Sequence, residues 1–116
     1  MLPHSFRLSD KKSFDFVFQE GQYTTIQELS FKWHPTRLSQ SRVGFIASKK
    51  NFPKAHDRNR AKRLLREAFR TQLFALRPGF DIIVLYRYKL KQLRFETIAH
   101  DISIFLEKNN LLQKIL

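Results

Sequence analysis

The apolar residues of this chain recur with helical spacing in two segments, one near each end. In residues 9–20, SDKKSFDFVFQE, positions spaced three and four apart share one helix face; they are Phe14, Val17 and Phe18. In residues 94–108 the corresponding positions are Ile98, Ile102, Phe105 and Leu106. Both segments are therefore predicted to be amphipathic helices.

Polar residues mark where the first helix begins and ends. Ser9 can cap its first free amides, and the carboxylate of Asp10 suits the positive end of a helix. Gly21 fits the position after the last turn. The pattern predicts a helix bounded by Ser9 and Gly21.

Between the helical segments the hydrophobic pattern changes to that of strands. Residues 29–34, LSFKWH, alternate apolar and polar, and residues 42–48 form a second predicted strand, joined to the first by a hairpin loop. The apolar run in residues 80–88, FDIIVLYRY, indicates a central strand covered on both faces. A further short strand at residues 22–26 is left open.

A third helix is predicted for residues 57–76, with Asp57 as its N-cap. Its apolar face carries Ala61, Leu64, Leu65, Ala68, Phe69 and Leu76. The predicted order is α-β-β-(β)-α-β-α. It defines an α+β fold, a small two-layer sandwich of helices on a sheet, and 116 residues suit one domain spanning residues 1–116.

Basic residues are concentrated on and around this third helix. The chain has a net charge of +12, and residues 49–70 hold nine Lys or Arg against Asp57 and Glu67. The face opposite the apolar one carries Asn59, Arg63, Arg66 and Arg70, flanked by Arg58, Arg60 and Lys62. Like charges three or four residues apart destabilise a helix, so an external polyanion is expected to supply the missing negative charge. Phosphate suits the planar fork of arginine. A solvated basic face and a membrane-surface helix are weaker alternatives.

The residue types needed for catalysis by the protein itself are missing from the sequence. The four His are scattered, no pair of carboxylates has metal-site spacing, and there is no Gly-rich phosphate loop. The chain also lacks Cys, an apolar run of 18 residues and a signal-peptide core, which favours the cytoplasm and excludes disulfides. We expect no catalytic residue, no metal site, no small-molecule substrate and no membrane partner.

The segment RNRAKRLLREAFR, residues 58–70, resembles the signature of the bacterial ribonuclease P protein subunit. Three more blocks resemble the same family in order along the chain: FRLSDKKSFDFVFQEG (6–21), RVGFIASKK (42–50) and PGFDIIVLYR (78–87). The resemblance therefore covers nearly the whole chain.

The resemblance implies an assisting role in removing the 5′ leader from precursor tRNA, with catalysis and Mg²⁺ binding carried mainly by an RNA subunit. It implies RNA contacts by Lys49, Lys50, Arg58, Asn59, Arg60, Lys62, Arg63, Arg66 and, at the end of the basic segment, Arg70. It also implies a cleft for the leader, walled by Phe14 and Phe18, with Phe31, Lys32 and Trp33 as candidates from the strand at 29–34. Finally, it implies a left-handed β-α-β crossover, against the usual right-handed rule.

Two other functions fit the charge and size. A structural RNA-binding protein of the ribosome would explain both equally well. A duplex-DNA binder with residues 57–76 as recognition helix is weaker, because the partnering turn and helix are missing.

Overall fold

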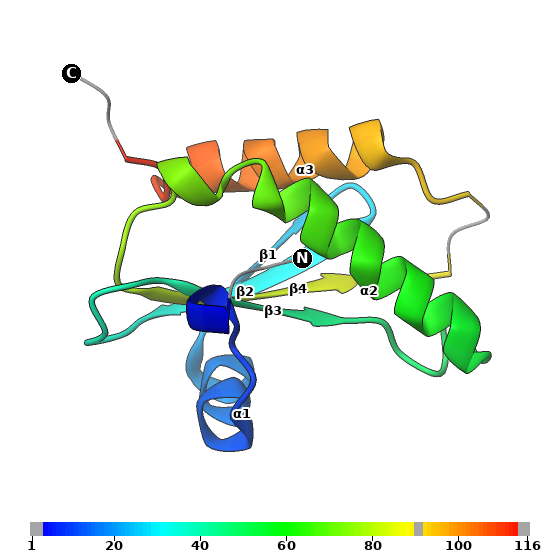
Figure 1. Ribbon diagram of the computed structural model, residues 1–116, viewed down its shortest axis with the longest axis horizontal. Coiled ribbons are helices and arrows are strands. Elements are labelled where there is room, and N and C mark those ends of the chain that lie inside the picture. The colour runs from blue at the N-terminus through cyan, green and yellow to red at the C-terminus, as the bar shows by residue number, and fades with distance from the viewer. Residues whose placement is uncertain (1–3, 90–91, 114–116) are drawn as a thin grey trace.

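The computed structural model describes residues 4–89 and 92–113 (Figure 1). Its elements in chain order are η1 (His4–Phe6), α1 (Lys11–Glu20), β1 (Gln22–Ile26), β2 (Leu29–Pro35), β3 (Arg42–Ile46), α2 (Ala55–Arg70), η2 (Leu73–Ala75), β4 (Phe80–Tyr86) and α3 (Phe95–Lys108). The predicted α+β class is confirmed, and the strand left open at residues 22–26 is present as β1. No helix in these ranges is long and apolar enough to cross a membrane.

The four strands form one sheet in the order β1-β2-β4-β3. β2 pairs antiparallel with β1 and with β4, whereas β3 runs parallel to β4. The predicted hairpin between β2 and β3 is therefore wrong, because β4 lies between them. Three consecutive residues of β4, Ile82, Ile83 and Val84, are completely buried, so this strand needs cover on both faces and takes the interior position.

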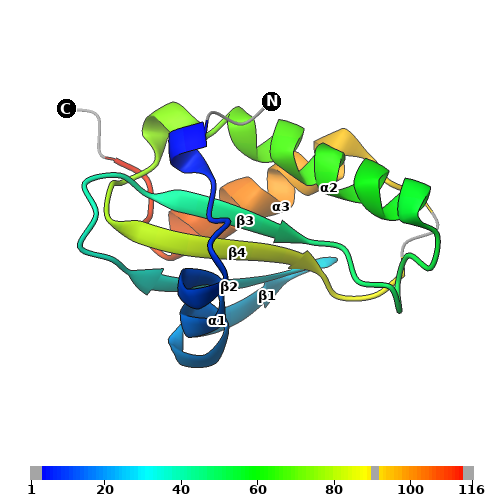
Figure 2. The same cartoon turned by 60° about the horizontal axis from the view of Figure 1, so that its bottom comes forward.

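The connection from β3 through α2 to β4 is a crossover between parallel strands. In Figure 2 both strands point to the right, α2 passes behind the sheet, and β4 lies below β3. This arrangement is left-handed, as the family resemblance implied and contrary to the usual rule.

Helices cover both faces of the sheet. The large core lies under α2 and α3, where side chains of β2 and β4 such as Phe31 and Val84 meet Leu65 and Phe105. The smaller core lies under α1 and centres on Leu8, Val17 and Ile83. Figure 1 shows α1 on the side of the sheet opposite α2 and α3. The structure therefore has one more layer of helix than the predicted two-layer sandwich, because α1 covers the second face of the sheet.

Several predicted helix ends are shifted. The N-cap of α1 is Asp10, whose side chain accepts a hydrogen bond from the Ser13 amide at 3.0 Å, and not Ser9. α2 begins after Lys54, which makes no side-chain cap, so Asp57 lies in its first turn. α2 ends at Arg70, and Leu76 reaches the core from beyond the 3-10 turn η2 instead of from the helix.

Candidate nucleic-acid interface

The outer face of α2 carries most of the predicted RNA-binding residues. Asn59, Arg60, Arg63 and Arg66 are exposed, and Lys62 is half-buried. Within the described residues, none of these five side chains forms a hydrogen bond or an ion pair. The inner face buries Ala61, Leu65, Ala68 and Phe69 against the sheet. The amphipathic pattern therefore holds a row of cationic groups facing outward.

Two of the predicted contacts have partners within the protein. The Arg58 guanidinium donates from Nη1 to the carbonyl oxygens of Phe52 and Pro53, at 3.0 and 2.8 Å. Arg70 forms an ion pair with Glu67 at 3.3 Å. Arg58 therefore holds the loop before α2 in place. From the sequence, only an RNA contact was expected for this residue.

Lys49 and Lys50 lie in an exposed turn just after β3. The turn is closed by the Phe52 amide, which donates to the Ser48 carbonyl at 2.8 Å. This turn leads from the sheet edge to α2, so the two lysines extend the basic surface towards the sheet.

A second group of polar and aromatic side chains lies on the α1 side of the sheet. Lys32 donates from Nζ to the Phe18 carbonyl at 2.7 Å, and the same atom lies 3.7 Å from the centroid of the Phe18 ring. The Tyr23 ring is 5.9 Å from this ammonium group. Phe18 is 41% exposed and Tyr23 59% exposed. A cation between two accessible rings is suited to stacking bases and to binding a phosphate.

Of the two α1 aromatics that the resemblance placed in the cleft, only Phe18 is well exposed. Phe14 is partly buried and packs beside Ile46 and Leu85 on the smaller core. The ring of Phe14 also lies so close to Gly44 that a Cβ atom there would meet it at 2.9 Å. Phe14 therefore contributes mainly to packing under α1.

The expectation that Phe31 or Trp33 faces this cleft is wrong. Successive strand residues point to opposite faces, so Lys32 faces α1 while both neighbours face α2 and α3. Phe31 is 0% exposed and stacks on Phe105 with centroids 3.9 Å apart; Trp33 is 5% exposed and meets the same ring edge-on. The register of β2 against β4 places Lys32, and not Phe31 or Trp33, on the side of α1. The alternating pattern alone could not show which of these residues faces that side.

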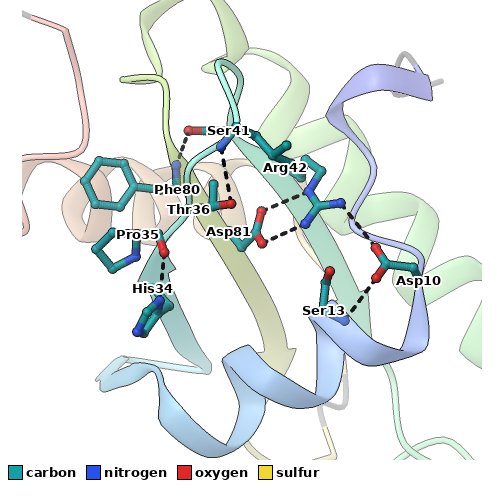
Figure 3. Close-up of polar contacts among 10 residues, drawn as sticks. Asp10, Ser13, His34, Pro35, Thr36, Ser41, Arg42, Phe80 and Asp81 are labelled. Atoms are coloured by element: carbon teal, nitrogen blue, oxygen red, sulfur yellow. Dashed lines mark hydrogen bonds and ion pairs between the residues drawn. The ribbon is translucent and has the colours of Figure 1, made fainter.

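A polar network that the sequence analysis did not predict ties α1 to the sheet (Figure 3). Arg42 in β3 donates to both carboxylate oxygens of Asp81 in β4, at 3.0 and 2.8 Å, and to Asp10 at 3.2 Å. The hydrogen bonds from Ser13 lower the pKa of Asp10, and the bonds to Asp81 raise the pKa of Arg42. The network fixes the N-terminal end of α1 over the sheet.

A cavity of about 640 Å³ lies beside this network, between α1 and the ends of β2 and β3. It is lined by Phe16 and His34, whose rings meet edge-on with centroids 4.9 Å apart, and by Arg42. The cavity thus lies next to Phe16, and neither Phe14 nor Phe18 lines it.

The described residues contain no group of three or more His, Asp or Glu side chains able to hold a metal ion.

Comparisons with known proteins agree with this geometry. The family model described as Ribonuclease P matches residues 2–110. A Ribonuclease P protein component of Legionella pneumophila (strain Lens) is 48% identical over 82 residues, covering 70% of this chain and 68% of the relative. One from Photorhabdus laumondii is 40% identical over 91 residues, covering 78% of this chain and 76% of the relative.

Solved structures give the same result. The RNase P protein from Thermotoga maritima superposes with a TM-score of 0.77 at 30% identity, covering 88% of this chain and 96% of its own. The RNase P protein of Staphylococcus aureus, at 22% identity, shares the fold with a TM-score of 0.79 over 93% of this chain and 98% of its own. The small α+β domain, its left-handed crossover and its basic helix α2 place the chain in the class of ribonuclease P proteins. The chain belongs to the ribonuclease P protein family.

Proposed function

We propose that this chain is the protein component of a tRNA-processing ribonuclease P, and that it binds both the catalytic RNA and the 5′ leader of precursor tRNA. The observation that carries the proposal is the position of two RNA-suited surfaces on opposite sides of one sheet (Figure 1). The first is the row of cations on α2, and the second is the Phe18–Lys32–Tyr23 group beside α1.

The α2 surface suits folded RNA. Arg60, Lys62, Arg63 and Arg66 follow one another along a helix, and their side chains are not neutralised by carboxylates within the described residues. Phosphates of the catalytic RNA would supply the counter-charge, and each contact would release condensed ions. Lowering the repulsion between RNA segments would let the RNA hold its Mg²⁺ ions at ordinary concentrations.

The α1 surface suits a single strand. Phe18 and Tyr23 offer accessible rings, and Lys32 between them offers a positive charge to the backbone. A single-stranded leader can place unstacked bases on such rings, whereas mature tRNA has no leader to offer. Contacts made only by the leader would favour substrate over product.

The proposal is tested by reconstitution with the catalytic RNA. Cleavage of precursor tRNA is measured at low Mg²⁺ with and without the protein, and the affinities for leader-bearing and mature tRNA are compared. We expect stimulation by the protein and tighter binding of the leader-bearing form. Absence of stimulation would reject the assignment.

The alternative of a structural ribosomal RNA-binding protein rests on the same basic face. It requires no difference in affinity between leader-bearing and mature tRNA. Equal affinity in the reconstituted complex, together with no stimulation, would favour it.

A further inference from the structure

A groove with a volume of about 650 Å³ opens where α2 and α3 both begin. One wall is the loop before α2 together with the first two turns of that helix, and the other wall consists of Lys89 and residues 92–94, which precede α3. The groove is distant from α1 and from its aromatic surface.

The charge of this groove is strongly positive. Its cationic side chains are Lys54, Arg60, Lys89 and Arg94, and its one acidic side chain is Asp57. The Asp57 carboxylate lies 3.6 Å from Nδ1 of His56, and among the described residues it forms no ion pair with any of the four cations. Among the described residues, Lys54, Arg60 and Lys89 have no ion pair or side-chain hydrogen bond. These cations come from two segments far apart in the sequence, and only the fold brings them together.

Arg94 is held in position by a neighbour in the groove. Its Nε and Nη2 atoms donate to the Gln92 side-chain oxygen at 3.1 and 2.7 Å. A neutral amide leaves the positive charge of Arg94 uncompensated. The groove therefore contains four cations with a net positive charge, and their counter-charge has to come from outside the protein.

Part of the lining of the groove is apolar, namely Phe52, Pro53 and Leu93. Phe52 is buried and meets Tyr86 edge-on, with centroids 5.2 Å apart, whereas Pro53 is exposed and Leu93 half-buried. A free inorganic anion gains nothing from apolar side chains, whereas a nucleotide can place its sugar or base on Pro53 and Leu93 and its phosphate among the cations. Through Arg60 the groove is also continuous with the basic face of α2.

We propose that this groove is a further RNA-binding subsite, which takes a short single-stranded or unpaired RNA segment, with its phosphates bound by Lys54, Arg60, Lys89 and Arg94. The inference rests on the proposed function, since it extends RNA binding from α2 to Lys89 and Arg94. The RNA segment belongs either to the catalytic RNA or to precursor tRNA, because both offer the same phosphate and base chemistry.

The test uses the double variant Lys89→Ala with Arg94→Ala in the full-length protein. Neither residue lies on α2, so the basic helix stays intact. The matched control is Arg37→Ala with Lys108→Ala, which removes the same charge from exposed positions outside the groove. Thermal unfolding of both double variants checks that they fold. The single change Lys89→Glu, with Lys108→Glu as its control, repeats the test at exposed positions.

Binding to the catalytic RNA, and binding of leader-bearing and mature tRNA to the reconstituted complex, are measured from low to moderate salt. The groove variant is expected to bind one of these RNAs about tenfold more weakly, and its salt slope is expected to fall by about 1.4–1.8, for two lost phosphate contacts. The control should change far less.

Loss confined to the catalytic RNA assigns the groove to that subunit, and loss confined to tRNA assigns it to the substrate. If the groove variant and the control match for every RNA while the wild-type protein binds and stimulates cleavage, the groove inference is overturned and the proposed function stands. If the wild-type protein binds no RNA, both fail.

Discussion

The guanidinium group of Arg42 forms a two-pronged hydrogen bond with the carboxylate of Asp81, joining the parallel strands β3 and β4. Asp81 is only 5% exposed, so its carboxylate has to be compensated within the protein, and Arg42 does this. The remaining Arg42 nitrogen reaches Asp10, the N-cap of α1. One side chain therefore holds two strands together and fixes the start of the helix that carries Phe18.

Replacing Arg42 is expected to destabilise the protein. Arg42→Ala leaves the buried Asp81 carboxylate unpaired, and we expect the free energy of unfolding to fall by about 3 kcal/mol in urea denaturation at pH 7. Arg42→Lys keeps the charge but loses the fork, so a smaller loss is expected. In the double variant Arg42→Ala with Asp81→Asn part of the stability should return. Equal losses in the single and double variants would contradict this role.

The basic face of α2 should control the salt dependence of RNA binding. Arg63→Ala with Arg66→Ala removes two exposed cations, so the slope of log K against log salt should fall by about 1.4–1.8. The free energy of unfolding should hardly change, because neither side chain has a partner in the described residues. An unchanged slope would place the RNA contacts elsewhere.

Arg58 should behave differently from Arg63 and Arg66. Its hydrogen bonds to the Phe52 and Pro53 carbonyls hold the loop before α2, so Arg58→Ala is expected to lower the free energy of unfolding by about 1–2 kcal/mol. Urea denaturation of Arg58→Ala beside Arg63→Ala measures the contrast. If the two variants unfold alike, the loop does not depend on Arg58.

The surface beside α1 should discriminate between tRNA forms. Phe18→Ala removes an exposed ring that touches the Lys32 ammonium group, so we expect about tenfold weaker binding of leader-bearing tRNA to the reconstituted complex. Binding of mature tRNA and of the catalytic RNA should stay the same. Phe31→Ala is the contrasting variant, since it opens a cavity in the core and should cost about 3–5 kcal/mol of stability. Parallel weakening of both tRNA forms by Phe18→Ala would contradict a leader contact.

The pH dependence of stability should include a contribution from Asp101. Burial, followed by the nearby charge of Glu28, raises the pKa of Asp101 above its ordinary value of 3.8, and its Oδ2 atom has no partner. A folded state that binds this proton more tightly than the unfolded state loses stability as the pH rises from 3.8 through the raised pKa. Asp101→Asn should therefore gain about 1 kcal/mol at pH 7, and the gain should vanish near pH 4.

Urea denaturation of Asp101→Asn at several pH values between 4 and 7 measures this effect. Glu107→Gln, at an exposed position on the same helix, is the matched control for the loss of one negative charge. A constant difference between Asp101→Asn and the wild-type protein across that range would exclude titration of Asp101.

Gly21 shows how a correct prediction can have a different physical reason. The sequence placed it just after the last turn of the first helix, a position where glycine commonly adopts positive φ. It does end α1, but its φ is −72°, in the extended region. A Cβ atom there would meet the Val17 carbonyl oxygen at 2.5 Å and the Trp33 carbonyl oxygen at 2.9 Å. Glycine is needed because two carbonyls leave no room for a Cβ atom: that of Val17, in the last turns of α1 itself, and that of Trp33, which only the packing of α1 beside β2 brings close.

Local periodicity and charge were enough to predict the three helices with their amphipathic faces, the strands β2, β3 and β4 and the basic character of α2, whereas β1 was left open. Even the interior position of β4 followed from its unbroken apolar run. The order of strands, the choice between Phe31, Lys32 and Trp33, and the network from Arg42 to Asp81 were decided only by the tertiary structure. They depend on the register of β2 and β3 against β4, and that register is set by long-range packing on both faces of the sheet, which no local pattern contains.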